Sequence, residues 1–405
     1  MSRRKVAVVG GGAAGFFLAI NLKEMCPQAE VTIVERASRV LRKVEISGGG
    51  RCNVTNTFED VGDLREVFPR GHRLLKRLFR QFGPQDAWRW FEQRGVSLVA
   101  QDDHCVFPRS QDSHSIINLF LAEAHRLGII VKTGCAIASL DELSDYDFIC
   151  VTTGGQPRSE GLQWLGQDIE TPVPSLFTLS IADERLHALM GTVVPLADRQ
   201  GQSEPTVMLP GTKLRAQGAL LITHWGMSGP AILRLSSYAA RYLAEHDYRA
   251  PLLVNWIGVT ETAAAEAVAT LVQSCRQKQL TSVAPMGLPL RLWAYLAEKA
   301  LGQRASQAPW NSLNAKEQRR LATVLTADAY QTAGRAPHRD EFVTCGGVSL
   351  TAVDPATLQS RTHPGLFFAG EVLDVDGVTG GFNFQAAWTT AYTVASSIAS
   401  SIGKM

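Results

Sequence analysis

Apolar positions follow two different periodicities near the two ends of the chain. Residues 5–9 form a short β-branched run, and apolar side chains then recur at helical spacing over 16–22. A long helix of small residues is expected from about Asn383. Further strands are expected within 30–36, 128–140, 146–155 and 366–369. Strands that alternate with helices in this way predict an α/β fold built on a parallel sheet.

The middle of the chain has a different pattern. From about Thr171 to about Trp256, short strands interrupted by prolines predict a small antiparallel β-barrel. Helical patterns follow, one behind a Thr260 cap and one behind an Asn314…Glu317 capping box, before "EFVTCGGVSL" returns the chain to the first domain. The expected organisation is an α/β domain in two parts, 1–172 and 337–405, interrupted by a barrel over 173–258 and a helical lobe over 259–336.

Between the first strands and the middle lies a segment with a basic helical pattern. Residues 59–83 are expected to be helical, with apolar side chains on one face and, mostly on the other, Arg73, Lys76, Arg77 and Arg80. This basic face could bind RNA or an acidic lipid surface, but such a stripe is more often the solvated face of a packed helix. Farther on, a β-hairpin is expected to turn at Asp102-Asp103, and Ser113 can cap a helix that runs to about Leu127.

The first predicted strand leads directly into a glycine-rich loop. Gly10, Gly12 and Gly15 fit the pattern G-x-G-x-x-G, with an apolar strand before it and an apolar helix face after it. The first glycine permits the tight turn, the second lets a pyrophosphate approach the backbone, and the third lets helix and strand pack closely. The free N–H groups at the start of the helix would face the phosphates. This context predicts a dinucleotide site rather than a purely structural βαβ turn.

An acidic residue follows at the expected distance. Glu35 ends the second strand about 20 residues after the last glycine of the loop. Its carboxylate would accept hydrogen bonds from the adenosine ribose hydroxyls and would disfavour a 2′-phosphate. In related folds, the strand end near Cys135 and Ala136 approaches the adenine.

The C-terminal stretch "PGLFFAGEVLDVDGVTGGFNFQAAWTT" indicates which dinucleotide is bound. A strand ends at Gly370-Glu371, and a loop with Asp376, Gly380 and Gly381 then leads into a long helix. The acid suits a ribityl hydroxyl or a phosphate-bridging water, and the helix N-terminus suits the flavin C2 carbonyl, which gains negative charge on reduction. This layout predicts FAD as the resident cofactor.

The chain resembles the YhiN/BaiN-type flavoproteins, the aminoacetone oxidase-like group of the two-dinucleotide-binding-domain superfamily. Four stretches carry the resemblance: "VVGGGAAG", "ISGGGRCNVTN", "THWGMSGPAIL" and the region from "VTCGGVSLTAVDPATLQS" to "GGFNFQAAWTT". It implies noncovalently bound FAD and a Rossmann-like FAD/NAD(P)-binding domain interrupted by a small antiparallel β-barrel and a helical lobe. It also implies oxidoreductase chemistry, with enone reduction and amine oxidation among the activities assigned to members.

By that resemblance, the stretch "SGGGRCN" at 47–53 lies beside the flavin. Gly48–Gly50 would let main-chain N–H groups approach the cofactor, Arg51 could stabilise phosphate or reduced-flavin charge, and Asn53 is a hydrogen-bonding candidate. Cys52 is interpreted as a packing contact rather than a redox partner, because no second cysteine stands nearby in the sequence. Lys43, just upstream, could also face the site.

These arguments predict a set of cofactor contacts, while no residue is assigned to catalysis. No metal site is predicted, because no cluster of ligand-type side chains stands out. The predicted cofactor contacts are Gly10, Gly12, Ala13, Ala14, Gly15, Glu35, Arg36, Lys43, Ser47, Gly48, Gly49, Gly50, Arg51, Cys52, Asn53, Cys135, Ala136, Thr153, Gly154, Gly155, Gly370, Glu371, Asp376, Gly380, Gly381, Phe382 and Asn383.

One segment departs from the family pattern. Members often carry a polar segment of the form S-x-P-x-T-G-S-T-G-D-G-Y after the "TGG" turn, whereas here Gly154-Gly155 is followed by "QPRSEGLQWLGQD". The shape of the flavin face that this segment normally forms is therefore left open, and so is any substrate inherited by analogy.

Composition narrows the classes of partner. Lys+Arg (40) and Asp+Glu (38) nearly cancel, so neither nucleic acid nor an anionic membrane is predicted as the main partner. The seven cysteines contain no CxxC, which disfavours a zinc ribbon or a redox dithiol. The odd number of cysteines and the short apolar run at the N-terminus predict a cytoplasmic protein without a signal or membrane segment, and the oligomeric state is left open.

The leading functional hypothesis is an FAD-dependent oxidoreductase that acts on a small carbonyl, enone or amine. Because there is only one G-x-G-x-x-G, either NAD(P)H visits the flavin as a transient donor or the organic substrate itself reduces it. One alternative is a flavin-dependent RNA-modifying protein, in which helix 73–80 and "NAKEQRR" would have to matter. The other is a non-enzymatic protein with FAD as a structural cofactor. His224 and Trp225 are candidates for a substrate lid.

Overall fold

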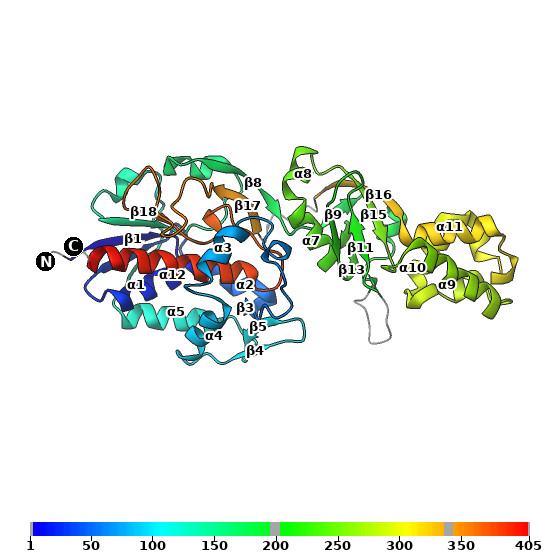
Figure 1. The fold of residues 1–405 in the computed structure, drawn as a ribbon, viewed down its shortest axis with the longest axis horizontal. Coiled ribbons are helices and arrows are strands. Elements are labelled where there is room, and N and C mark those ends of the chain that lie inside the picture. The colour runs from blue at the N-terminus through cyan, green and yellow to red at the C-terminus, as the bar shows by residue number, and fades with distance from the viewer. Residues whose placement is uncertain (1–2, 195–202, 336–342, 404–405) are drawn as a thin grey trace. The chain divides into compact units, whose positions relative to one another are not determined.

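The computed structural model describes residues 3–194, 203–335 and 343–403, and the chain forms two compact units (Figure 1). The first unit combines both ends of the chain, Met1–Pro174 and Val343–Met405. The second unit is the intervening segment, Ser175–Phe342. Of the predicted boundaries, the one at 172 lies near the junction after Pro174 and the one at 336 lies outside the described residues. The boundary at 258 would divide the second unit into a barrel and a helical lobe, and this four-part division stays a prediction.

A five-stranded parallel sheet organises the first unit. Its strand order is β18-β7-β1-β2-β6, and every pairing in it is parallel. The C-terminal strand β18 thus lies beside β7, a strand near the end of the N-terminal part, which confirms the Rossmann-type α/β prediction. The strands are β1 (Lys5–Val9), β2 (Glu30–Val34), β6 (Ile130–Lys132), β7 (Phe148–Val151) and β18 (Leu366–Phe368).

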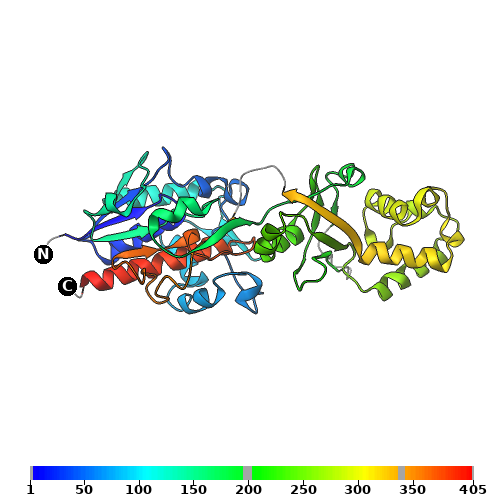
Figure 2. The ribbon, with the colours of Figure 1, turned by 90° about the horizontal axis from the view of Figure 1, so that it is seen from above.

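Two helices from opposite ends of the chain pack against each other beside this sheet. α1 (Ala13–Met25) and α12 (Phe382–Gly403) run together, and the view from above shows α12 in red along most of the unit (Figure 2). The ring of Phe17 on α1 lies 4.5 Å from that of Trp90 and 5.0 Å from that of Trp388 on α12. Phe17 and Trp388 are fully buried, so this aromatic contact joins the two ends of the chain through a water-free core.

Smaller elements complete the first unit. A three-stranded antiparallel sheet has the order β3-β5-β4, and β4 and β5 form the predicted hairpin around Asp102-Asp103. β8 pairs with β17 in a separate two-stranded sheet. The remaining elements are β3 (Thr55–Asn56), β4 (Leu98–Ala100), β5 (Cys105–Pro108), β8 (Ile169–Ser175), β17 (Val343–Val348), α2 (Arg42–Gly50), α3 (His72–Leu78), α4 (Pro84–Glu92) and α5 (His114–Arg126).

Two local predictions in this unit need correction. The helix expected over 59–83 is limited to a short 3-10 turn at Leu64–Glu66 and to α3, because Pro69 and the left-handed Gly71 (φ +77°) interrupt it. Ser113 does stand at the N-cap of α5, but its hydroxyl donates to the carbonyl of Glu45 at 2.9 Å instead of capping the helix.

The second unit is an eight-stranded antiparallel sheet with helices. The strand order is β10-β13-β14-β9-β16-β15-β11-β12. The sheet is antiparallel, as predicted. Among the described residues, however, no pairing joins the edge strands β10 and β12, so the sheet does not close into a barrel there. Its strands are β9 (Leu179–Ile181), β10 (Val193–Val194), β11 (Thr206–Met208), β12 (Arg215–Gln217), β13 (Leu220–Ile222), β14 (Gly226–Ser228), β15 (Pro251–Asn255) and β16 (Asp328–Arg335). Its helices are α6 (Glu184–His187), α7 (Pro230–Tyr238), α8 (Ala240–Glu245), α9 (Glu261–Ser274), α10 (Leu290–Leu301) and α11 (Ala315–Thr326).

In the sequence, the helices α9, α10 and α11 of the lobe lie between β15 and β16, two strands that are neighbours in this sheet. The predicted caps are confirmed, because Thr260 accepts from the N–H of Ala263 and Asn314 forms a capping box with Glu317. The helical prediction for 259–336 is wrong beyond Thr326. Residues 328–335 form β16, whose side chains at first alternate between buried and exposed, as on a half-buried strand.

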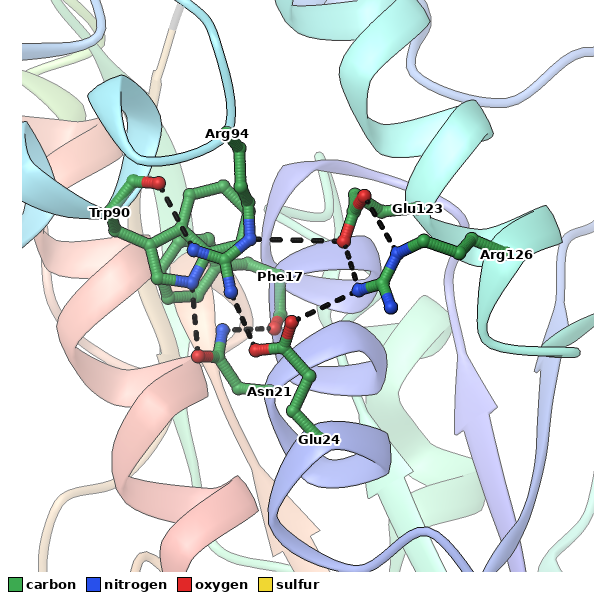
Figure 3. A network of polar contacts seen from close by, with 7 residues as sticks. All are labelled: Phe17, Asn21, Glu24, Trp90, Arg94, Glu123 and Arg126. Atoms are coloured by element: carbon green, nitrogen blue, oxygen red, sulfur yellow. Dashed lines mark hydrogen bonds and ion pairs between the residues drawn. The ribbon is translucent and has the colours of Figure 1, made fainter.

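A network of charged side chains joins three helices of the first unit (Figure 3). Arg94 follows α4; its guanidinium stacks 4.0 Å from the ring of Trp90 and donates to Glu24 of α1 at 2.5 Å. Arg126 of α5 donates to Glu24 at 3.2 Å and to Glu123 at 2.6 Å. Because the Arg94 side chain is only 15% exposed, its charge depends on these partners and cannot be fully solvated instead.

We predict that Arg94→Met lowers the free energy of unfolding by about 2 kcal/mol, because it removes the mostly buried cation of the network and leaves Glu24 and Glu123 with the more exposed Arg126 alone. The matched control is Arg89→Met, whose ion pair with Asp86 is exposed and should contribute less than about 0.5 kcal/mol. Urea unfolding followed by circular dichroism measures both. Hydrogen bonding to Arg126 lowers the pKa of Glu123, so the network's contribution is present at neutral pH and is lost as the pH falls through that lowered pKa. Equal loss in the two variants would contradict the assignment.

Candidate cofactor site

Two glycines of the N-terminal loop allow three backbone segments to cross in contact. A Cβ on Gly10, which has φ +115°, would lie 2.4 Å from the carbonyl oxygen of Thr152. A Cβ on Gly15 would lie 2.0 Å from the carbonyl oxygen of Gly10. Any side chain at these positions would therefore push apart the ends of β1 and β7 and the first turn of α1.

Gly12 has the opposite environment. It is the N-cap of α1, and a Cβ placed on it would meet nothing within 4 Å. The space beyond the first turn is therefore open, and the N–H groups of Ala13 and Ala14 belong to that turn, where an α-helix leaves its donors without internal partners. These donors and the positive end of the helix dipole suit a diphosphate at this position.

The end of β2 supplies an oriented carboxylate. Glu35 accepts hydrogen bonds from the N–H of Gly11 and the N–H of Ala37, both at 2.8 Å. Its own carbonyl accepts from the N–H of Cys135 at 2.9 Å, so the structure brings together Glu35 and the predicted adenine segment, whose Cys135 and Ala136 are exposed. Each carboxylate oxygen keeps a lone pair that can accept from a ribose hydroxyl. Arg36, also predicted, is exposed next to it.

A buried hydroxyl group without a hydrogen-bond partner lies directly after β7. Thr153 follows β7, and its Oγ1 is buried without a hydrogen-bond partner in the described part of the chain. The neighbouring Thr152 is satisfied, since its hydroxyl lies 3.1 Å from the carbonyl oxygen of Val9 and 2.9 Å from that of Gly10. A buried hydroxyl without a partner is uncommon in proteins, and a bound polar ligand would explain it.

Side chains from distant parts of the sequence contact one another next to Gly154 and Gly155, which follow Thr153. The ammonium group of Lys43 lies 2.9 Å from Oε2 of Glu371, while Oε1 of Glu371 accepts from the N–H of Thr344 at 2.9 Å. A Cβ on Gly155 would clash with Thr344 and Glu371, at 2.4 and 2.7 Å. The neighbouring Gly154, in the left-handed region with φ +73°, completes this cluster, which positions the predicted acid at the edge of the parallel sheet.

The stretch 47–53 is wound tightly and carries a fixed cation. Gly48, Gly49 and Gly50 have φ values of +56°, +69° and +83°, a left-handed series that favours glycine. The guanidinium of Arg51 donates from Nε to the carbonyl of Gly48 at 3.1 Å and lies 4.2 Å from the centre of the Phe107 ring. Ser47 donates to the carbonyl of Val44 at 2.8 Å, which fixes the start of the turn. The turn therefore presents a positive charge held at a defined position.

The side chain of Cys52 lies inside the protein. It is fully buried, and this burial raises the pKa of its thiol to about 12, partly opposed by a hydrogen bond with Ser47. A thiol that stays protonated at neutral pH is a poor nucleophile and a poor redox partner. This supports the interpretation of Cys52 as a packing contact.

The C-terminal loop returns to the same place. Gly370, with φ +77°, is so close to α1 that its Cβ would lie 2.9 Å from the Cβ of Ala14. Gly381 would place a Cβ 2.2 Å from the carbonyl oxygen of Thr55 and 2.7 Å from Oδ1 of Asn53. The loop before α12 therefore touches both the nucleotide loop and the stretch 47–53.

Two predicted contacts in this loop have internal partners instead. Asp376 is fully buried and forms a two-point ion pair with the guanidinium of Arg70. Asn383 exchanges hydrogen bonds with the backbone of Gly377, accepting at 2.8 Å and donating at 2.9 Å. Both side chains shape the loop, and their direct contact with a cofactor stays a prediction. Gly380 belongs to the same loop, and Phe382 begins α12 directly after it, with its ring 5.1 Å from that of Phe58.

Several residues of the site carry no signal in the sequence. Thr344, which aligns Glu371, lies in a buried strand, and Phe107, which supports Arg51, lies in the hairpin. Arg70 stands in a turn and pairs with a carboxylate 306 positions away. The rewritten segment after Gly155 contains a 3-10 helix at Ser159–Leu165. Among the described residues no cluster of three or more metal-ligating side chains is present, and no helix is long and apolar enough to span a membrane.

The geometry defines a class of protein: a Rossmann-type domain in which segments from both ends of the sequence meet at one candidate dinucleotide site. The profile of the HI0933-like protein Rossmann domain matches residues 4–397. The chain belongs to this family, an FAD-binding Rossmann family, and is a flavin-dependent oxidoreductase. The open space at Gly12 and the orphaned hydroxyl of Thr153 are consistent with the FAD that the family implies.

Relatives of the chain span nearly its whole length. It is 26% identical to the 3-dehydro-bile acid delta(4,6)-reductase of Clostridium scindens over 96% of this chain and 97% of that protein. It is 27% identical to the ribosomal RNA dihydrouridine synthase of Escherichia coli over 97% of each. A 3-ketosteroid delta1-dehydrogenase from Sterolibacterium denitrificans, solved with 1,4-androstadiene-3,17-dione, matches with a TM-score of 0.51 and 11% identity over 98% of this chain and 99% of that one. This last likeness shows the fold alone.

We predict that Gly12→Val abolishes FAD retention while the apoprotein keeps its thermal stability, because the added side chain enters open space that a pyrophosphate would need. Gly62→Val is the matched control, since a Cβ there also meets nothing within 4 Å but the residue lies in an exposed turn. The visible spectrum after purification and a thermal melt measure both properties. A yellow Gly12→Val protein with normal FAD content would contradict the assignment of the loop.

We predict that Cys52 resists alkylation at pH 8, whereas the exposed Cys135 reacts readily. Burial raises the pKa of Cys52 to about 12, so its reactive thiolate should be populated only as the pH rises toward that value. Iodoacetamide labelling followed by peptide mass spectrometry measures both thiols in one sample. Equal labelling of Cys52 and Cys135 at pH 8 in the folded protein would contradict the packing role.

Proposed function

We propose that the protein is an FAD-dependent reductase that delivers a hydride to a carbon–carbon double bond conjugated with a carbonyl group. The observation that carries this proposal is what two kinds of full-length relative have in common. One is named for a reductase of a 3-keto bile acid with delta(4,6) unsaturation and the other for a synthase of dihydrouridine, which is uridine with its C5–C6 bond reduced. Both double bonds are conjugated with a carbonyl group. Of the three substrate classes considered, which are carbonyls, enones and amines, the enones are therefore the best supported.

The residues of the site are consistent with this chemistry. When bound, FAD would accept a hydride from a donor and pass it to the acceptor. The first turn of α1 would hold the diphosphate, Glu35 the adenosine ribose, and Glu371 a hydroxyl of the ribityl chain. Arg51 and the N-terminus of α12 would oppose the negative charge that the flavin gains on reduction.

We further propose NAD(P)H as the transient electron donor. The chain has one G-x-G-x-x-G, so the nicotinamide would visit the flavin without a second nucleotide domain. A dithiol route from another protein is disfavoured, because Cys52 is buried and its thiol stays protonated. A cytoplasmic location and a small-molecule substrate belong to the same proposal, and the roles of His224 and Trp225 as a lid stay predictions. His224 is exposed in the turn between β13 and β14.

A second candidate is the reduction of uridine within RNA. It is supported by the relatives from Escherichia coli and Haemophilus influenzae that are named ribosomal RNA dihydrouridine synthase, at 27% and 26% identity. It is also favoured by an exposed basic face on α3 of the first unit. Both candidates use the same hydride chemistry at the flavin, and they differ only in what carries the double bond.

We predict that NADH or NADPH bleaches the bound flavin under anaerobic conditions and that an enone such as a 3-keto-Δ4 steroid restores its yellow colour. The two steps balance, because the nicotinamide loses a hydride that the β-carbon of the enone gains, and a proton from solvent completes the product. The Gly12→Val protein, without flavin, is the matched control for direct reaction between donor and acceptor. A flavin that both nicotinamides leave oxidised would contradict the reductase proposal and favour an oxidase reduced by its own substrate or a structural flavin.

A further inference from the structure

A row of four cations stands out on the surface of the first unit. Arg73, Lys76 and Arg77 lie on α3, and Arg80 lies in the turn that follows it. All four are exposed, and none has an acidic partner in the described part of the chain. Several other arginines of this unit are paired with carboxylates, as Arg70 is with Asp376 and Arg94 is with Glu24. We call these four residues the α3 cation row.

The α3 cation row is held firmly by the opposite face of its helix. Leu74, Leu75 and Leu78 are buried, so α3 cannot roll or lift its apolar side into a lipid surface. Arg73, Lys76 and Arg77 stand at i, i+3 and i+4 on the solvent side of α3, and the exposed Arg80 follows in the next turn. A fixed row of cations with a buried apolar side suits a polyanion that stays in water.

The α3 cation row begins beside the loop that leads into α12. Arg70, just before α3, forms both the ion pair and an antiparallel bridge with Asp376. Gly71, the N-cap of α3, packs so closely on Val375 that its Cβ would lie 2.6 Å away. The helix and the loop of the cofactor site are therefore one packed structure.

An aromatic group stands at the end of the same row. Phe79, between Arg77 and Arg80, is partly exposed, and its ring lies 5.5 Å from that of the partly exposed Phe58. Phe58 in turn packs on Phe382, the first residue of α12. A row of cations with a partly exposed aromatic residue at its end is similar to the surfaces that bind single-stranded nucleic acid through its phosphates and its bases.

We propose that the α3 cation row holds the phosphate backbone of an RNA substrate beside the cofactor site. The inference rests on the second candidate of the proposed function and adds the surface that would bind the RNA. A small enone carries no row of phosphates and would not need these side chains. The near-zero net charge of the chain does not oppose the proposal, because the positive charge is concentrated locally.

The test uses the FAD-loaded full chain and a fluorescein-labelled single-stranded RNA of mixed sequence that contains uridine. The variant is Arg73→Gln/Lys76→Gln/Arg77→Gln/Arg80→Gln, and binding is measured by anisotropy across a salt series. Each phosphate contact on a single strand contributes about 0.7 to the slope of log K against log salt. We expect the variant to lose roughly three units of that slope and to bind RNA about tenfold more weakly, or worse, at low salt.

The matched control is Lys316→Gln/Arg319→Gln/Arg320→Gln on α11, another basic run, whose three cations are also exposed. The RNA alternative named both basic segments of the sequence, whereas the present proposal assigns phosphate binding to the α3 cation row alone, so we expect this control to bind RNA as the wild type does. An equal loss of binding per removed charge in the two variants would overturn the proposal, because binding would then follow total charge. Wild-type protein that ignores RNA but binds vesicles containing phosphatidylserine would also overturn it, in favour of a membrane surface.

Two further readings separate this inference from the proposed function. FAD content and the visible spectrum of the α3 variant show whether it is folded and loaded, and a thermal melt confirms its stability. Flavin reduction by NAD(P)H in the wild type tests the reductase chemistry independently of RNA. Unchanged RNA binding by a yellow, stable α3 variant would overturn the docking surface even if the flavin is reduced normally.

Discussion

The site depends on the close crossing of backbone at the carboxyl ends of the parallel strands. Gly10, Gly15 and Thr152 are in contact there, and a methyl group on either glycine would overlap a carbonyl oxygen. This contact fixes where α1 begins, and the beginning of α1 decides where an anionic group can sit. Gly370 then approaches the same turn from the C-terminal side, so a single constraint closes both parts of the first unit on one place.

Charge is distributed around that place in a consistent way. Donors without internal partners stand at the first turn of α1, a carboxylate stands at the end of β2, and the Lys43–Glu371 pair stands at the far side. Arg51 is held over an aromatic ring, so its position does not depend on the ligand. Preorganised charges of this kind stabilise a developing negative charge without rearranging at the moment of reaction. The buried Cys52 adds packing but no reactive thiolate.

Family membership and fold do not distinguish which substrate accepts the hydride. That choice depends on surfaces outside the cofactor site. The relatives named for bile-acid reduction and for dihydrouridine synthesis are equally similar to this chain, so overall identity does not separate them. A physical distinction comes from α3, because its exposed cations would help an RNA substrate and would do little for a small neutral enone. The two acceptors therefore make different demands on one helix while they make the same demand on the flavin.

Local patterns in the sequence determined the βαβ loop, its acid, the helix caps of the second unit and the β-hairpin, because each depends on neighbouring residues only. Tertiary structure decided the rest. Lys43 and Glu371 are in contact although 328 positions separate them in the sequence, and Arg70 and Asp376 are separated by 306 positions. No local pattern in the sequence predicts contacts of that range. The same reason explains why the end of the expected helical lobe proved to be β16, whose partners β9 and β15 lie far away in sequence. Burial of Cys52 and isolation of the Thr153 hydroxyl are likewise properties of packed neighbours, which a sequence read residue by residue does not contain.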